Sequence, residues 1–340
     1  MGIKRIFMLS NNYTYQIPKN FDSVRGLAIV LLVFYHVVGS DSVSGLRLPM
    51  DSDWHSSMAI MELIRMPVFT ILSGYLYGIR RVVKEDFLVF SIKKIRRLGV
   101  PLIVLTFFTL IGKYWIYGIN PDWFRAFFWP YQHFWFLQAL LIVFALISVI
   151  DIFFKPNVFI LFLGVLLMSF LSAFFPLSGP FSIGQALYLM PFFVMGIFIF
   201  ESKIVFIDKS IMILFPVVAF FLWVWHLLGV YGKVGVIERN SILGTMSGIF
   251  ACISLLKYMP KFNFLHNMGH YSYSIYLWHS ICLAAARMVI WMLGVGDVFV
   301  VFFVSSMGGL LGPILLHKIF IKHSFFSSLM LGVINNKKNA

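Results

Sequence analysis

The chain has 340 residues, of which 60% are hydrophobic and 12% carry a charge. A soluble globular domain has about 45–50% apolar and about 25% charged residues, so this composition indicates an integral membrane protein. The net charge of +14 comes from cations between apolar runs, which argues against a nucleic-acid-binding protein. The two cysteines, Cys252 and Cys282, lie within apolar runs, so neither a disulfide framework nor a thiolate metal site is expected.

Ten apolar runs approach the length that crosses a bilayer, because about 20 apolar residues in a helix span roughly 30 Å of hydrocarbon. We therefore expect an all-α integral membrane protein with about ten transmembrane helices in one bundle around a central polar cavity. The expected single domain covers 1–340, with a core at about 21–323 and cytoplasmic tails at 1–20 and 324–340. The expected spans are 24–40, 57–79, 98–117, 133–152, 157–175, 184–200, 210–230, 241–258, 272–294 and 297–320.

Cations are distributed unevenly between the two sets of connecting segments. If the N-terminus lies in the cytoplasm, the cytoplasmic segments carry most of the lysines and arginines, including the cluster at 93–97. The positive-inside rule then places both termini in the cytoplasm. The outer segments and span ends hold far fewer cations, namely Arg47, Lys113, Arg125, Lys233 and Arg239.

The first span contains two ionisable residues, Arg25 and His36, within the segment FDSVRGLAIVLLVFYHV. Eleven residues make about three helical turns, so both side chains project from one face, roughly 16.5 Å apart along the axis. Ionisable groups inside a membrane usually face the protein interior and are candidates for function. We expect both to open onto one common cavity. The alternative is a snorkelling arginine and a histidine that only packs in the bundle.

The second span carries Glu62 and Arg65, which are three residues apart and can pair on one helix face. Ser73 is eleven residues beyond Glu62 and lies on the same face. Pro67 and Gly74 permit a kink and a close helix approach. A purely structural ion pair is the alternative to a functional site.

The ninth span places Ser272, Tyr276 and His279 at helical spacing, so a hydroxyl, a phenol and an imidazole form one stripe. Arg287 follows eleven residues after Tyr276, and His133 begins the fourth span. We expect these polar groups to line a cavity, although an aromatic stripe is more often packing.

The segment FSIKKIRRLGVP contains Lys93, Lys94, Arg96 and Arg97 at the cytoplasmic end of the third span. Lys94 and Arg97 are three residues apart, a spacing suited to binding adjacent phosphates. The alternatives are a topology signal or an anionic-lipid anchor. No His-x3-His motif or cysteine pair offers ligand spacing, so no metal is expected.

Together these motifs resemble those of the integral membrane acyltransferases of acyltransferase family 3, which O-acetylate cell-surface sugars. The resemblance covers about three quarters of the chain, in the order of the family. The matching elements are Arg25-x10-His36, MPVFTILSGYLY at 66–77, Lys94-x-x-Arg97 before Pro101, HFWFL at 133–137, PFFVMG at 191–196 and YSYSIYLWH at 271–279.

The resemblance implies a bacterial inner-membrane O-acetyltransferase that uses cytoplasmic acetyl-CoA and keeps no permanently bound cofactor. Its acceptor would be a hydroxyl of a surface polysaccharide or undecaprenyl-linked sugar, such as lipopolysaccharide O-antigen or exopolysaccharide. The essential Arg and His of the family correspond to Arg25 and His36, and its basic pair corresponds to Lys94 and Arg97. Lys94 stands where arginine is usual, which replaces a bidentate phosphate contact by a point charge.

On this reading the nucleotide and phosphates of acetyl-CoA bind the basic residues, and His36 acts as general base on the acceptor hydroxyl. Glu62 orients the imidazole or neutralises Arg65, and a transient acetyl-histidine is the covalent variant. The rival hypothesis is a transporter or flippase of an anionic lipid-linked sugar. The candidates for stabilising the oxyanion are Arg65, Ser73, Tyr276 and His279.

Overall fold

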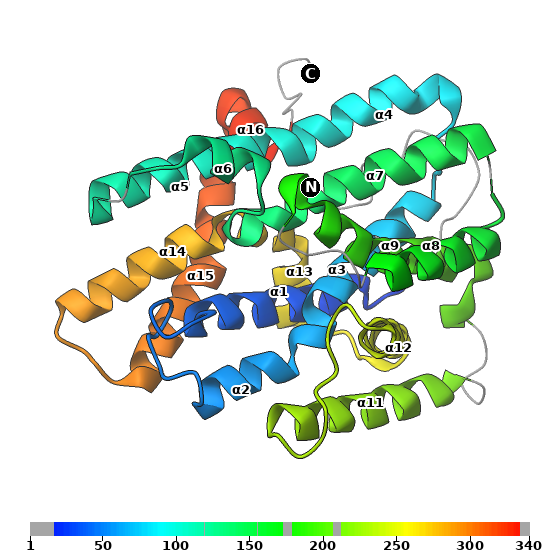
Figure 1. The fold of residues 1–340 in the computed structure, drawn as a ribbon. Helices are drawn as coiled ribbons and strands as arrows, with labels where there is room; N and C mark the ends of the chain where they lie inside the picture. The colour runs from blue at the N-terminus through cyan, green and yellow to red at the C-terminus, as the bar shows by residue number, and fades with distance from the viewer. Residues whose placement is uncertain (1–16, 119, 155, 173–178, 207–211, 334–340) are drawn as a thin grey trace.

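A computed structural model describes residues 17–333 except 119, 155, 173–178 and 207–211, and the part described is helical without strands (Figure 1). Its first half comprises α1 (Phe21–Val38), α2 (Asp53–Ile60), α3 (Glu62–Gly78), η2 (Lys84–Asp86), α4 (Phe87–Lys94), η3 (Ile95–Gly99), α5 (Val100–Tyr117), α6 (Trp123–Phe128), η4 (Gln132–Phe134) and α7 (Trp135–Phe154). Its second half comprises α8 (Val158–Ser172), η5 (Pro180–Ser182), α9 (Ile183–Ser202), η6 (Ile204–Phe206), α11 (Leu214–Val230), α12 (Ile242–Tyr258), α13 (Asn263–His270), α14 (Ser272–Met292), α15 (Val298–Phe320) and α16 (Ser324–Leu331).

Within the described residues, 7 helical stretches are long and apolar enough to cross a membrane. The other three expected spans coincide with α8, α11 and α12, which have 15, 17 and 17 residues. The number of ten spans and the cytoplasmic location of both termini therefore remain predictions. Of the expected tails, 1–16 and 334–340 lie outside the described residues. The seven qualifying stretches are Phe21–Val38, Asp53–Gly78, Lys84–Ile116, Trp123–Phe154, Pro180–Ser202, Ser272–Met292 and Val298–Phe320.

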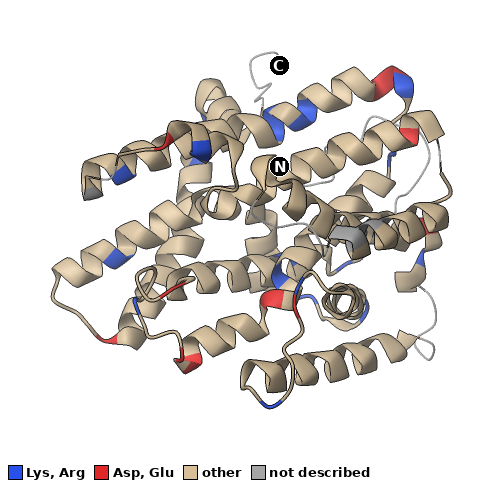
Figure 2. Cartoon of the chain, in the orientation of Figure 1, with Lys and Arg blue, Asp and Glu red and all other residues tan. Residues whose placement is uncertain are grey.

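α1 and α3 lie in the middle of the bundle, with α11 on one side and α4 and α5 on the other (Figure 1). α1 contacts α3, α13, α14 and α15, whereas α3 packs on α9 and α12. Charged residues are sparse along these helices (Figure 2). The polar face of α1 is thus enclosed by other helices, as expected for ionisable groups in a membrane protein.

The expected third span begins too late in the sequence. η2, α4, η3 and α5 form one continuous helical stretch that includes Lys84–Ile116, so the basic cluster lies inside a helical stretch and not at its end. η3 is a π-helix from Ile95 to Gly99, and such segments are rare and frequent at functional sites.

The close helix approach predicted from Gly74 is present between α3 and α9. A Cβ atom at Gly74 would lie 1.9 Å from the carbonyl oxygen of Phe193, and one at Gly196 would lie 2.1 Å from that of Ile71. At each glycine the backbone of the other helix therefore lies too close for any side chain. The expected second span is divided at Met61, where α2 ends and α3 begins.

We expect Gly74→Ala to lower the free energy of unfolding by about 2 kcal/mol, because overpacking against a backbone atom forces the helices apart. Thermal unfolding of the detergent-solubilised protein measures the change. Gly112→Ala is the matched control, since nothing lies within 4 Å of the added Cβ atom. Replacing this helical glycine should stabilise slightly, by about 0.5 kcal/mol. Equal melting temperatures for both variants would contradict the close contact at Gly74.

Candidate active site

A cavity of about 350 Å³ lies among α1, α3, α4, η3, α7, α13 and α14, and four of the ten polar residues in its lining are cationic. We call it the basic cavity. Partial burial lowers the pKa of the His270 imidazole at its wall. The polar residues that line the basic cavity are Arg25, Ser73, Tyr77, Arg80, Lys94, Arg97, His270, Ser272, Tyr273 and Tyr276.

Arg25 is fixed by the crossing of α1 and α13. Its Nε donates a hydrogen bond of 2.8 Å to the carbonyl oxygen of Gly269, and its guanidinium lies 3.5 Å from a carboxylate oxygen of Asp22. The helices approach so closely that a Cβ atom at Gly26 would lie 1.8 Å from the carbonyl oxygen of Leu265. The predicted cation therefore faces the protein interior in a fixed position.

Lys94 and Arg97 rest on aromatic rings. Lys94 Nζ lies 3.5 Å from the ring centroid of Phe144, and the Arg97 guanidinium lies 4.0 Å from that of Tyr273. The Tyr273 hydroxyl also donates to the Arg97 carbonyl. Neither cation has a carboxylate partner among the described residues. Their positive charge is therefore free to bind an anion in the basic cavity.

The other two members of the cluster, Lys93 and Arg96, do not line the basic cavity. Lys93 is exposed to the surroundings. The two residues at a three-residue spacing, Lys94 and Arg97, thus face the cavity, and the other two cations of the cluster do not. Ser73 lines the same cavity, and its hydroxyl donates to the Phe69 carbonyl at 2.8 Å.

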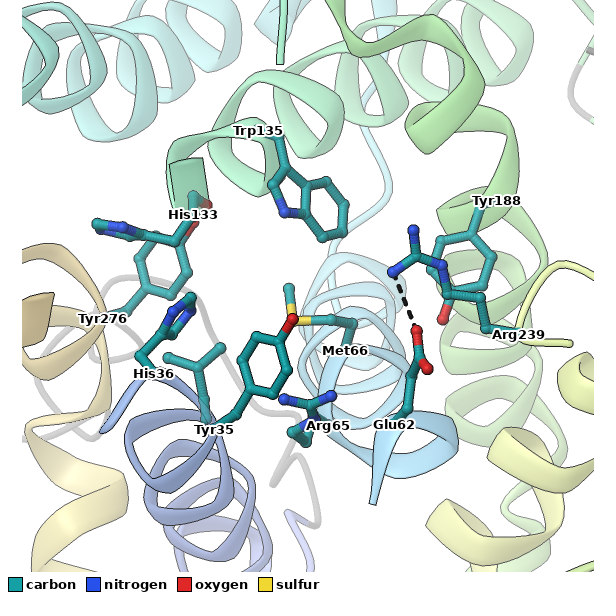
Figure 3. Close-up of a pocket in the computed structure, with 11 residues that line it drawn as sticks. Tyr35, His36, Glu62, Arg65, Met66, His133, Trp135, Tyr188, Arg239 and Tyr276 are labelled. Carbon is teal, nitrogen blue, oxygen red and sulfur yellow. Dashed lines mark hydrogen bonds and ion pairs between the residues drawn. The ribbon is translucent and has the colours of Figure 1, made fainter. Parts of the chain in front are cut away.

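A second, smaller cavity of about 90 Å³ is lined by two of the three predicted imidazoles, those of His36 and His133 (Figure 3), whereas His279 lines neither cavity. We call it the histidine cavity. It is formed by α1, α3, η4, the start of α7, α9, α14 and the segment before α12. Its lining consists of Leu32, Tyr35, His36, Glu62, Arg65, Met66, His133, Trp135, Tyr188, Arg239 and Tyr276.

Three histidines from distant parts of the chain form one cluster. The ring centroid of His36 lies 5.7 Å from that of His133 and 4.9 Å from that of His279, and those two are 4.6 Å apart. His279 Nδ1 lies 2.8 Å from the Tyr276 carbonyl oxygen, which can only accept, so Nδ1 carries the hydrogen. Its buried Nε2 remains an acceptor without a partner in the described structure. No three His, Cys, Asp or Glu side chains of the described residues are arranged to hold a metal ion.

The Glu62–Arg65 ion pair that the spacing permits is not found among the described residues. Glu62 instead forms an ion pair of 3.1 Å with Arg239, from the segment between α11 and α12. The Arg65 guanidinium lies over the ring of Tyr35, 3.9 Å from its centroid. Arg65 is 7% exposed, and its Nε has no hydrogen-bond partner among the residues described. A spacing of three permits a pair but cannot exclude a better partner 177 residues away.

Six of the eleven residues that line the histidine cavity were not among the predicted site residues, and Trp135, Tyr188 and Arg239 are three of them. Trp135 belongs to the HFWFL motif, and Arg239 is one of the few outer cations, so each carried a signal that spacing alone did not use. Tyr188 lies in an apolar run and carried none. Tyr188 and Arg239 lie across the cavity from His36 in Figure 3.

Arg287 lines neither cavity, contrary to the prediction. Its guanidinium lies 5.3 Å from the ring centroid of Trp291, and that of Arg47 lies 5.1 Å from the same centroid. Eleven residues from Tyr276 correspond to roughly 16.5 Å along α14, which carries Arg287 past the end of the cavity. Helical spacing indicates the face of a helix but does not indicate how far along it a cavity extends.

The prediction of one central cavity is also wrong. Arg25 lines the basic cavity and His36 lines the histidine cavity, and of the described residues only Tyr276 lines both. The Tyr276 hydroxyl donates a hydrogen bond to the His133 carbonyl oxygen. The two ends of α1 thus open onto two compartments that meet at one tyrosine.

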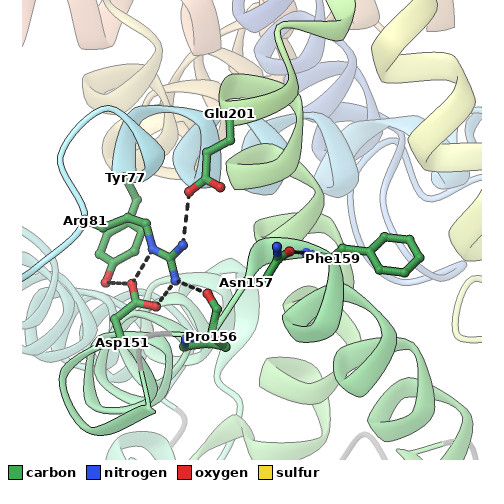
Figure 4. Close-up of polar contacts among 7 residues, drawn as sticks. All are labelled: Tyr77, Arg81, Asp151, Pro156, Asn157, Phe159 and Glu201. Atoms are coloured by element: carbon green, nitrogen blue, oxygen red, sulfur yellow. Dashed lines mark hydrogen bonds and ion pairs between the residues drawn. The ribbon is translucent and has the colours of Figure 1, made fainter.

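A buried ion pair fixes the wall of the basic cavity at the end of α3 (Figure 4). Arg81 pairs bidentately with Asp151 of α7 and lies 3.0 Å from Glu201 of α9. Asp151 also accepts a hydrogen bond of 2.7 Å from Tyr77, which lines the basic cavity. The network therefore connects three helices to one wall residue.

Comparison with known proteins gives one match. A family model described as an acyltransferase domain, that of acyltransferase family 3, matches residues 19–318. No curated protein and no solved structure matches the chain significantly.

We expect Asp151→Ala to lower the free energy of unfolding by about 3 kcal/mol or more, because it leaves Arg81 without its main partner in a largely buried position. Asp151 is 3% exposed, whereas the Arg80–Asp86 pair is 76% and 45% exposed. Asp86→Ala is therefore the control and should cost less than about 1 kcal/mol. Chemical unfolding in detergent distinguishes them, and an equally small effect of both would refute the structural role of Asp151.

Proposed function

Because the chain belongs to acyltransferase family 3 and has the apolar helices of a membrane protein, we propose that it is a membrane O-acetyltransferase. It moves an acetyl group from cytoplasmic acetyl-CoA to a hydroxyl of a surface polysaccharide or lipid-linked sugar, in the bacterial inner membrane. The observation that carries the proposal is the pair of adjoining cavities at the two ends of α1, one basic and one rich in imidazole.

The basic cavity suits the donor. Arg25, Lys94 and Arg97 supply positive charge for phosphates, and the remaining wall is mostly aliphatic and aromatic. The rise of roughly 16.5 Å between Arg25 and His36 is on the scale of an extended phosphopantetheine arm. With the phosphates at the cations, the thioester points along α1 toward the histidine cavity.

The histidine cavity suits the acceptor. His36 takes the proton of the acceptor hydroxyl, and the oxygen of that hydroxyl attacks the thioester carbonyl carbon. Collapse of the tetrahedral intermediate breaks the carbon–sulfur bond, and the proton passes from His36 to the sulfur of CoA. The acceptor leaves as an acetyl ester, and no permanently bound cofactor takes part.

Arg65 is the candidate best suited to stabilise the oxyanion. The hydroxyls of Ser73 and Tyr276 already donate to backbone carbonyls, and His279 Nε2 is an acceptor. Arg65 is cationic, lines the histidine cavity and has a buried Nε–H without a partner in the described part of the chain. A donor that is fixed in place before the reaction stabilises developing charge most effectively.

His36→Ala should reduce acetyl transfer by about 10²–10⁴-fold, because transfer loses its general base. Release of free CoA thiol by isolated membranes, which contain the acceptor, measures the rate. His323→Ala is the control, since this exposed histidine lines neither cavity. Full activity of purified His36→Ala would refute the mechanism, and no thiol release by the wild-type protein would favour a transporter. Loss of one acetyl unit from surface glycans in a deletion strain, seen by mass spectrometry, identifies the acceptor.

Lys94→Ala and Arg97→Ala should each raise the KM for acetyl-CoA about tenfold, because each removes a charge-assisted contact to phosphate. Lys93→Ala, one residue away but outside the basic cavity, should leave the KM unchanged. Initial rates of thiol release over a range of acetyl-CoA concentrations measure the difference. A similar rise in all three variants would instead indicate a general effect of surface charge.

A further inference from the structure

Three aromatic side chains separate the two cavities, and we call them the aromatic septum: Phe69, Phe136 and Tyr276. The Phe136 ring centroid lies 6.4 Å from that of Phe69 and 5.6 Å from that of Tyr276. Phe69 and Phe136 line only the basic cavity, whereas Tyr276 lines both. Tyr276 therefore occupies the point at which the cavities would otherwise join.

The position of Tyr276 depends on η4. Its hydroxyl donates to the carbonyl oxygen of His133, whose imidazole lies in the histidine cavity. Gln132, directly before His133, has φ of 46°, a left-handed backbone that is uncommon for residues other than glycine. An acceptor that contacts His133 would touch the same short helix that holds the tyrosine, and one that contacts Trp135 would touch the residue directly after it.

Water is the chemical competitor of the sugar hydroxyl. If water in the histidine cavity reached the thioester, His36 would take a proton from the water molecule. The oxygen of that water molecule would attack the thioester carbonyl carbon. The carbon–sulfur bond would break, acetate would leave and the CoA sulfur would receive the proton. The net result is hydrolysis of acetyl-CoA without transfer, and exclusion of water is a known means of preventing such side reactions.

We propose that Tyr276 is a specificity-determining residue that shields the donor thioester from water in the histidine cavity until an acceptor displaces it. This inference rests on the proposed function, because it requires acetyl-CoA in the basic cavity. It also explains how Arg25 and His36 act on one reaction while lining separate cavities. The septum opens only when both substrates are present, so thioester and hydroxyl meet without a continuous water-filled path.

The test measures thiol release from acetyl-CoA alone by the purified full-length protein, without any acceptor. Tyr276→Ala should raise this acceptor-independent hydrolysis about tenfold or more, because the shield against water is lost. Tyr276→Phe keeps the ring but loses the hydrogen bond to His133, so a smaller rise is expected. Trp278→Leu is the control, since Trp278 packs on Phe320 and lines neither cavity. It should hydrolyse acetyl-CoA at the wild-type rate.

A second variant distinguishes a breached septum from a loosened fold. Adding His36→Ala to Tyr276→Ala should remove the extra hydrolysis, because water then lacks its base; hydrolysis that persists would overturn the proposal. Hydrolysis at the wild-type rate in Tyr276→Ala and Tyr276→Phe, each with wild-type melting behaviour and acetyl-CoA binding, would also overturn it. Should Tyr276→Ala fail to fold, Tyr276→Phe alone decides. Failure of the wild-type protein to bind acetyl-CoA would instead refute the proposed function.

Discussion

A guanidinium or an imidazole inside a bilayer is stable only where protein groups or water surround it, because hydrocarbon cannot replace its hydration. α1 carries one such group near each end. α13 crosses so closely at Gly26 that the Gly269 carbonyl accepts a hydrogen bond from the Arg25 guanidinium. η4 and α14 place the imidazoles of His133 and His279 beside that of His36. The helices around α1 therefore create both cavities by satisfying its two polar residues. Any substrate that uses these groups has to enter between the same helices.

Features that depend on helical periodicity could be predicted from the sequence. The spacing of eleven residues correctly placed Arg25 and His36 toward the interior, and Gly74 correctly indicated a close helix contact. The spacing of Lys94 and Arg97 likewise identified the two members of the basic cluster that line the basic cavity. In each case one helix determines the direction of the side chain, so local sequence contains the necessary information.

Features that depend on the meeting of distant segments could not be predicted. Glu62 pairs with Arg239 because the segment before α12 folds over the start of α3, and no spacing within α3 reports this. The division into two cavities depends on where a tyrosine of α14 meets the backbone of η4. The same limit applies to Arg287, because helical spacing predicts a helix face but not how far the cavity extends along α14.

The two cavities are separated by about one helical turn or less along the helices that line both. On α3, Arg65 lines the histidine cavity and Phe69, one turn of about 5.4 Å further on, lines the basic cavity. On α7, the change occurs between the adjacent residues Trp135 and Phe136. A thioester held in the basic cavity thus needs to advance by about one helical turn to reach a hydroxyl beside His36. In the proposed mechanism, a donor in the basic cavity and an acceptor in the histidine cavity therefore react across a single aromatic layer.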